Sequence, residues 1–198
     1  GFLKAYPGET NEEKLLNAIE NKDIYIAFPP PGSTFRYSDI NYMIVGHIVE
    51  KASGLSFEEF LKQNIFNPLE MVNTGTGYFP AENTKLAIGY GPEGNKMVEG
   101  LSCADMSYGA GSMYSTVEDM YKWDRALYTE KLVSKQALDD MFTCYNGMYG
   151  YGWWFSETDK GLLYIHGGRL LNGTFSGFYV RNTITDTCVI VLGNDGFH

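Results

Sequence analysis

Two short segments of this sequence combine residue types that could take part in chemistry. The first is Tyr37-Ser38-Asp39, which follows a proline-rich segment at the start of a predicted helix. A phenol held at such a junction could face a cleft, and a neighbouring cation could lower its pKa. The alternative is a core tyrosine beside a helix N-cap, so this segment alone does not establish a site.

The second segment is His166-Gly167-Gly168-Arg169, where a predicted strand ends in an imidazole followed by two glycines. Residues without side chains allow a ligand to approach the strand edge, and the next backbone N–H could stabilise a developing oxyanion. An ordinary β-turn after a partly buried histidine would give the same pattern. Both interpretations remain open on the residues alone.

Composition excludes several classes of protein. The 198 residues are 44% hydrophobic and 15% aromatic, which is typical of a folded domain and not of a disordered chain. A formal charge of −9 would repel a phosphate backbone, so no nucleic-acid partner is expected. No apolar run approaches the length of a membrane span, and the first residues do not resemble a signal peptide.

No cofactor or metal is predicted. The three histidines are scattered, and the three cysteines lack metal-like spacing and are expected to be free thiols: Cys103, Cys144 and Cys188. The string from Gly89 to Gly94 fits a dinucleotide pattern, but Pro92 interrupts it and no helical pattern follows.

Helix signals dominate the first part of the chain. Apolar periodicity predicts a helix over 38–53 that ends at Gly54, and capping boxes at 56–59 and 115–118 predict two more helix starts. Another helix should begin at Ser134. Residues 73–114 hold eight glycines and little periodicity, so they are predicted to form long loops that line a cleft.

Strand signals follow in the second part. Four β-rich runs, 151–155, 162–166, 174–181 and 187–193, are separated by short turns and predict an antiparallel meander. Helices followed by strands indicate an α+β fold. We expect one partial domain over residues 1–198, mainly helix and loop in 1–145 and antiparallel strands in 146–198.

Six segments in order give the chain a family resemblance. Together they resemble the serine β-lactamase and penicillin-binding-protein family, specifically its class C and D-alanyl-D-alanine carboxypeptidase branch. The segments are 30–54, 65–71, 111–123, 149–153, 166–168 and 189–194.

The resemblance implies roles for the two segments. In this family a serine in a Ser-x-x-Lys turn is acylated, a Tyr-x-Asn tyrosine moves protons, and a strand motif binds the substrate. Tyr37 is similar to that tyrosine, and His166, Gly167 and Gly168 to the strand motif, which makes the Arg169 backbone N–H an oxyanion donor. Asp39 stands where the family has asparagine, and a carboxylate accepts hydrogen bonds but does not donate them unless it is protonated.

The Ser-x-x-Lys motif itself is absent, because no serine in the sequence has a lysine three positions later. We therefore expect the inner part of a larger enzyme, truncated at both ends and inactive by itself. The resemblance implies a parent acyl-serine hydrolase that cleaves D-alanyl peptides, esters or β-lactams. The alternative is a catalytically inactive pseudoenzyme or a peptidoglycan-binding module.

Further expectations follow from the same resemblance. A neutral imidazole attracts a β-lactam carboxylate less than a lysine does, which favours D-peptide or ester hydrolysis over β-lactamase activity. The substrate would be a small molecule or a peptidoglycan peptide, and the location the cell envelope or the exterior. The strand at 187–193 would lack its usual neighbour, so self-association through a free sheet edge is expected.

Overall fold

The computed structural model describes most of the chain. The described residues are 13, 14, 17, 20, 30, 32–76, 86–93, 96–99, 109–145, 147–170 and 174–195. Parts of the expected loops, 77–85 and 100–108, lie outside this set, as does Cys103.

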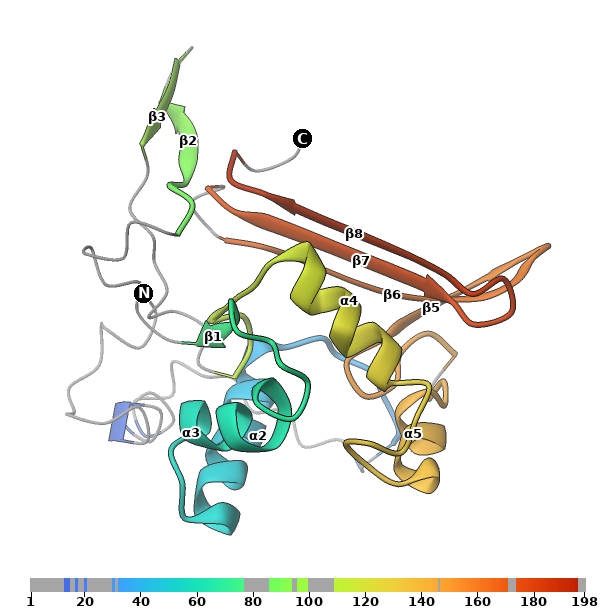
Figure 1. Cartoon of the computed structure of the whole chain (residues 1–198). Coiled ribbons are helices and arrows are strands. Elements are labelled where there is room, and N and C mark those ends of the chain that lie inside the picture. The colour runs from blue at the N-terminus through green and yellow to red at the C-terminus, as the bar shows by residue number, and fades with distance from the viewer. Residues whose placement is uncertain are drawn as a thin grey trace.

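A four-stranded antiparallel sheet forms one layer (Figure 1). Its strands are β5 (Trp154–Thr158), β6 (Gly161–Arg169), β7 (Ser176–Asn182) and β8 (Thr187–Gly193), paired in that order. The predicted meander and the α+β fold class are confirmed. The first strand was placed about three residues too early, because Gly152 adopts a left-handed conformation with φ of 85° and turns the chain there.

Two helix boundaries match predicted caps. Helix α2 (Asp39–Ser53) ends at Gly54, whose φ is 71° and whose N–H donates to the Glu50 carbonyl. Helix α3 (Phe57–Leu61) begins with the predicted capping box between Ser56 and Glu59 and continues into a π-helix, η2 (Lys62–Phe66).

The cap of helix α4 (Val117–Ala126) lies one residue later than predicted. The Thr116 hydroxyl accepts the hydrogen bond from the Asp119 N–H at 3.2 Å. Ser115 instead shares a hydrogen bond of 2.7 Å with the Thr74 hydroxyl, 41 positions away in the sequence. A tertiary contact therefore decides which hydroxyl caps the helix. Helix α5 (Lys135–Met141) begins at the predicted Ser134 cap.

Short strands lie in the region predicted as loops. Strand β1 (Gly75–Thr76) pairs with β4 (Met113–Tyr114), and β2 (Tyr90–Glu93) forms a hairpin with β3 (Lys96–Glu99). The hairpin projects away from the other elements (Figure 1). The described residues of the dinucleotide-like string thus lead into a strand and not into a helix.

Helix α4 lies across one face of the sheet, and the other described helices are on that same side (Figure 1). Aromatic residues fill the contact, because Trp123 of α4 stacks on Trp153 with ring centroids 5.7 Å apart. Tyr179 of β7 packs edge-on against Trp123, also at 5.7 Å. Burial of these large rings supplies much of the free energy that holds the helix on the sheet.

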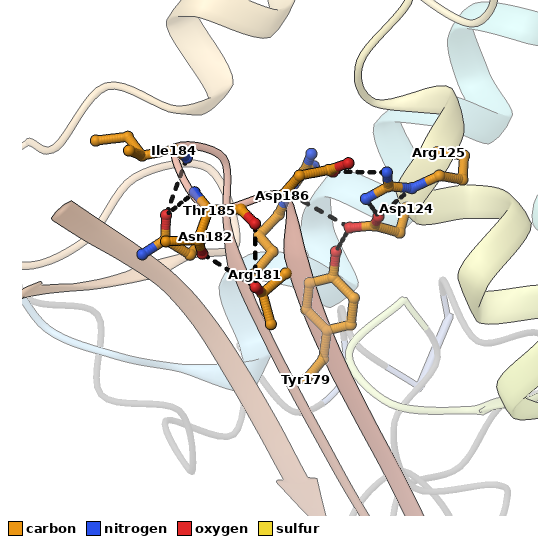
Figure 2. A network of polar contacts seen from close by, with 9 residues as sticks. Asp124, Arg125, Tyr179, Arg181, Asn182, Ile184, Thr185 and Asp186 are labelled. Carbon is orange, nitrogen blue, oxygen red and sulfur yellow. Dashed lines mark hydrogen bonds and ion pairs between the residues drawn. The ribbon is translucent and has the colours of Figure 1, made fainter. Parts of the chain in front are cut away.

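A buried carboxylate lies at the centre of this contact. Figure 2 shows side chains from α4 and β7 converging on Asp124, which is completely buried. The Tyr179 hydroxyl donates to one of its oxygens, and Arg125 Nε donates to the other at 2.8 Å. Arg181 Nε lies 3.4 Å from the carboxylate as an ion pair. Arg125 also reaches Asp186 in the β7–β8 turn at 2.7 Å.

Arg181 depends on this carboxylate. The side chain is 1% exposed, and its Nε and Nη1 atoms have no hydrogen-bond partner among the described residues. Its guanidinium lies over the rings of Tyr128 and Phe142, 4.4 and 5.1 Å from their centroids. Since the cation has little access to water, Asp124 supplies the charge that compensates it.

Replacing Asp124 by Asn should destabilise the protein by about 3–5 kcal/mol, because the buried Arg181 cation would lose its compensating charge. Urea unfolding followed by circular dichroism measures this difference. As a control, Asp139→Asn removes the partner of Lys135 in an exposed pair and should cost less than about 1 kcal/mol. Equal effects of the two substitutions would contradict the central role of Asp124.

Candidate active site

The structure brings the two chemistry-bearing segments together. Tyr37 precedes α2 and His166 lies on β6, yet the Tyr37 hydroxyl oxygen is 3.5 Å from His166 Nε2. The two residues are 129 positions apart in the sequence. At this distance the contact is a weak hydrogen bond. Tyr37 and His166 thus face each other across one site.

An aromatic cluster holds Tyr37 in place. We use this name for Phe35, Tyr37, Tyr149 and Trp154. The ring of Tyr37 stacks on Trp154 with centroids 5.7 Å apart and meets Tyr149 edge-on at 5.8 Å. Phe35 contacts the same two rings at 5.5 and 5.2 Å. These contacts restrict the direction in which the Tyr37 hydroxyl points.

The sequence contains only a partial signal for the aromatic cluster. The segment 149–153 contributed to the family resemblance, but no role was assigned to Tyr149, and Trp154 was not singled out. An observable signal was the spacing of Phe35 and Tyr37, since residues two apart in an extended segment share a face.

A groove of about 390 Å³ opens beside His166. Its walls come from the sheet and from α4, and its lining includes Trp123, Tyr151, Trp153, His166, Gly168 and Tyr179. Gly168 has no described atom within 4 Å of the position that a Cβ would occupy. A Cβ on Gly167 would instead lie 3.1 Å from the Phe178 ring. The missing side chain at Gly168 therefore leaves open space, whereas Gly167 accommodates a neighbour within the sheet.

The pairing of β6 with its neighbours indicates the direction of its last backbone N–H, that of Arg169. Leu170 N–H donates to the Phe175 carbonyl at 3.0 Å, on the side of β7. Successive residues of a strand direct their N–H groups to opposite edges, so that of Arg169 points away from β7. On that side β5 pairs with β6 only up to Ile165, which is opposite Trp154. The Arg169 N–H therefore faces a strand edge beyond the end of the β5 pairing.

Burial governs the pKa values at the site. It lowers the pKa of His166 below the ordinary 6.5, and the nearby Asp39 charge counteracts this only in part. Burial, and then the Asp39 charge, raise the pKa of Tyr37. The pKa of Tyr37 is therefore raised in this chain and not lowered by a neighbouring cation. At neutral pH the site holds a neutral imidazole and a protonated phenol.

Asp39 lies in the first turn of α2, two residues after Tyr37, and its side chain is exposed. Its charge acts on Tyr37, Tyr149 and His166, so it is close to all three. Asp39 thus accompanies the Tyr37 and His166 pair at the site.

Three further findings concern only the described residues. No group of three or more His, Cys, Asp or Glu side chains there is arranged to hold a metal ion. Within the same residues, Cys144 and Cys188 are free thiols, as predicted. None of the described helices has the length and apolar character needed to cross a membrane.

An NMR titration of the ring protons should place the midpoint of His166 below pH 6.5, because burial disfavours the imidazolium. Asp39→Asn should lower the midpoint further, since it removes a charge that favours protonation. The free energy of unfolding should fall as the pH drops through 6.5, because the unfolded chain binds the proton first. A midpoint at or above 6.5 would contradict the buried environment of the ring.

Comparisons with known proteins agree with the fold and the motifs. The family model described as "Beta-lactamase" matches residues 9–197. The Bacillus subtilis (strain 168) protein PbpX is 33% identical over 94% of this chain, which spans 46% of that protein. The octameric penicillin-binding protein homologue from Pyrococcus abyssi superimposes with a TM-score of 0.78 at 28% identity, over 98% of this chain and 48% of that one.

A D-stereospecific amidohydrolase from Streptomyces shares the fold, with a TM-score of 0.76 at 22% identity over 99% of this chain and 60% of that one. The chain thus spans about half the length of PbpX and of the Pyrococcus protein. The family resemblance and the β-lactamase-like fold are confirmed. On the match of the family model to nearly its whole length, this chain belongs to the β-lactamase family.

Proposed function

We propose that the protein containing this chain is an acyl-serine hydrolase that cleaves D-amino acid peptides, amides or esters. The observation that carries the proposal is the approach of Tyr37 to His166, a residue that lines the groove, with 3.5 Å between the hydroxyl oxygen and Nε2. A candidate proton-transfer group thus lies next to the strand whose edge is open. A structural neighbour of the same fold is named as a D-stereospecific amidohydrolase, which is consistent with this substrate class.

Each site residue has a role in this proposal. The nucleophilic serine would come from a part of the protein outside this sequence, since no Ser-x-x-Lys pair occurs within it. Tyr37 would take the serine proton while passing its own phenolic proton to the neutral His166 Nε2, and the reverse relay would return a proton to the leaving group. The Arg169 N–H would donate to the oxyanion, and the space beside Gly168 would admit the acyl group. His166, accepting a hydrogen bond from Tyr37, would keep the phenol directed into the groove.

The charge at the site favours amide and ester substrates over β-lactams. With its pKa lowered by burial, His166 is neutral at pH 7 and offers a substrate carboxylate no ionic attraction. Asp39 adds a negative charge nearby. A β-lactam carries a carboxylate that such a site would bind weakly, whereas a D-amino acid amide or ester does not.

A second candidate is a pseudoenzyme or peptidoglycan-binding module. Asp39 favours it, because a carboxylate replaces the amide donor that the family uses at this position. The approach of Tyr37 to His166 and the space at Gly168 favour the enzyme, since a binding module has no need of a positioned proton-transfer group. For either function we propose the cell envelope or the exterior as the location, as the family implies.

Acylation is the step that tests the enzyme. The full-length polypeptide should be labelled by a fluorescent penicillin or by a serine-directed phosphonate, and Tyr37→Phe should slow the labelling by about 10²–10⁴-fold. The matched control is Tyr121→Phe, which alters a tyrosine of similar exposure, 52% against 47%, on α4. Stopped-flow or gel fluorescence gives the rates.

Two outcomes would decide against the proposal. If no acylating probe labels the full-length polypeptide, the binding module is the better account. If the isolated 198-residue chain becomes labelled, one of its own serines is the nucleophile and the roles given above are wrong.

Self-association through the sheet edge is a second proposal. Among the described residues β8 has no strand beyond it, and Val189 and Val191 on it are 49% and 37% exposed. A structural neighbour is named as octameric, which is consistent with association in this fold.

The isolated chain should sediment as a dimer or larger species, and Val191→Lys should shift it toward monomer, because a charge on an edge strand opposes pairing. The control is Ile184→Lys in the β7–β8 turn, a side chain that is 76% exposed. Analytical ultracentrifugation distinguishes the species. A single monomeric species at high protein concentration would contradict the proposal.

A further inference from the structure

We infer that Asn194 and Gly89 are positioning residues, which hold the end of β6 so that the Arg169 N–H keeps its direction. The inference rests on the proposed function, because it concerns the oxyanion donor of that same site. Both residues act through the neighbours that they contact and not on the substrate itself.

Asn194 attaches the segment 88–90 to the sheet. It directly follows β8, and its backbone carbonyl accepts a hydrogen bond from the Tyr90 N–H at 2.6 Å. Its side-chain Nδ2 donates to the Ile88 carbonyl at 2.8 Å. Because these two bonds lie on either side of Gly89 in the sequence, they fix the position of this glycine relative to the end of the sheet.

Gly89 brings its backbone against the connection between β6 and β7. The glycine is buried, and a Cβ on it would lie 2.8 Å from Thr174 Cβ and 2.5 Å from a ring carbon of Phe175. Both distances are shorter than a van der Waals contact, so a side chain at Gly89 would displace these neighbours. Thr174 is 1% exposed, and close-packed neighbours limit its movement. The close approach therefore requires a residue without a side chain.

The connection between β6 and β7 is joined directly to the proposed oxyanion donor. The Phe175 carbonyl accepts the hydrogen bond from the Leu170 N–H at 3.0 Å. Leu170 follows Arg169, which is opposite Ser176 in the register of β6 and β7. A displacement of Phe175 is therefore transmitted to Leu170 and, through one residue of backbone, to the Arg169 N–H. The position of this donor matters, because it stabilises an oxyanion only at hydrogen-bonding distance.

The first test compares two substrates on the full-length polypeptide, N-acetyl-D-alanine methyl ester and the corresponding thionoester. Sulfur accepts hydrogen bonds weakly, so a displaced donor slows the ester more than the thionoester. Gly89→Val should lower kcat/KM for the ester by about 10–100-fold and the ratio of ester to thionoester by at least about fivefold. The control Ala87→Val adds a larger side chain at an exposed position of the same segment and should change neither value.

Asn194 is tested by removing its side-chain hydrogen bond. Asn194→Ala should lower kcat/KM for the ester by about 3–10-fold, with a smaller effect on the thionoester, because the bond to the Ile88 carbonyl is lost. The matched control is Asn64→Ala, which removes another exposed amide that donates to a carbonyl, that of Phe60, at 2.9 Å. Asn194 is exposed, so this variant is informative even if Gly89→Val fails to fold.

The second test requires no catalysis. Amide hydrogen exchange, followed by NMR on the full-length polypeptide, reports the bond between the Leu170 N–H and the Phe175 carbonyl. In Gly89→Val and Asn194→Ala this amide should exchange at least about fivefold faster, and the Arg169 amide signal should shift. Amides in the paired part of β7 and β8 serve as the internal reference. The two control variants should leave both signals unchanged.

The outcomes separate this inference from the proposed function. Unchanged Leu170 exchange in the folded variants, or an equal fall in the ester and thionoester rates, would overturn it, since the segment 88–90 would then only anchor the β2–β3 hairpin. If the unaltered protein hydrolyses neither substrate and no probe acylates it, the proposed function fails. Faster Leu170 exchange together with a shifted Arg169 signal would still support the positioning of the β6 end.

Discussion

The buried Asp124 carboxylate is the interaction on which the positions of the other elements depend. It accepts a hydrogen bond from the Tyr179 hydroxyl, pairs with Arg125 and compensates Arg181, so α4 is joined to β7 at a fully buried carboxylate (Figure 2). Because β7 pairs with β6 along seven residues, fixing β7 also fixes the strand that carries His166. Stacked tryptophans add contact area, but the charges determine the orientation. A buried ion pair affects the stability of the fold mainly because removing one partner leaves the other charge buried and uncompensated.

The candidate site uses two consequences of this arrangement. Strand β6 continues past the end of the β5 pairing, which leaves the Arg169 N–H on an open edge and His166 facing the groove. The aromatic cluster brings Tyr37 to the imidazole from the start of α2. Asp39 lies in the first turn of the same helix.

Local signals in the sequence predicted the elements but not every boundary. Gly54 and the Ser56 and Glu59 pair located helix boundaries correctly, because caps involve neighbouring residues only. The start of α4 was displaced by one residue, since Ser115 is engaged by Thr74 far away in the sequence. The pKa of Tyr37 is raised for a similar reason, because burial by tertiary contacts and the Asp39 charge act on the phenol and no cation offsets them. Motif order alone predicted that Tyr37 and His166 share a site.

We propose that substrates lie along the open edge of β6 opposite Tyr37. A crystal structure of the full-length polypeptide with a boronic acid analogue of a D-alanyl substrate would test this proposal. A boronate oxygen should lie within hydrogen-bonding distance of the Arg169 N–H, with the ligand beside Gly168 and the Tyr37 hydroxyl directed at the boronate. A ligand bound away from β6, or an Arg169 N–H already paired with another strand, would contradict it.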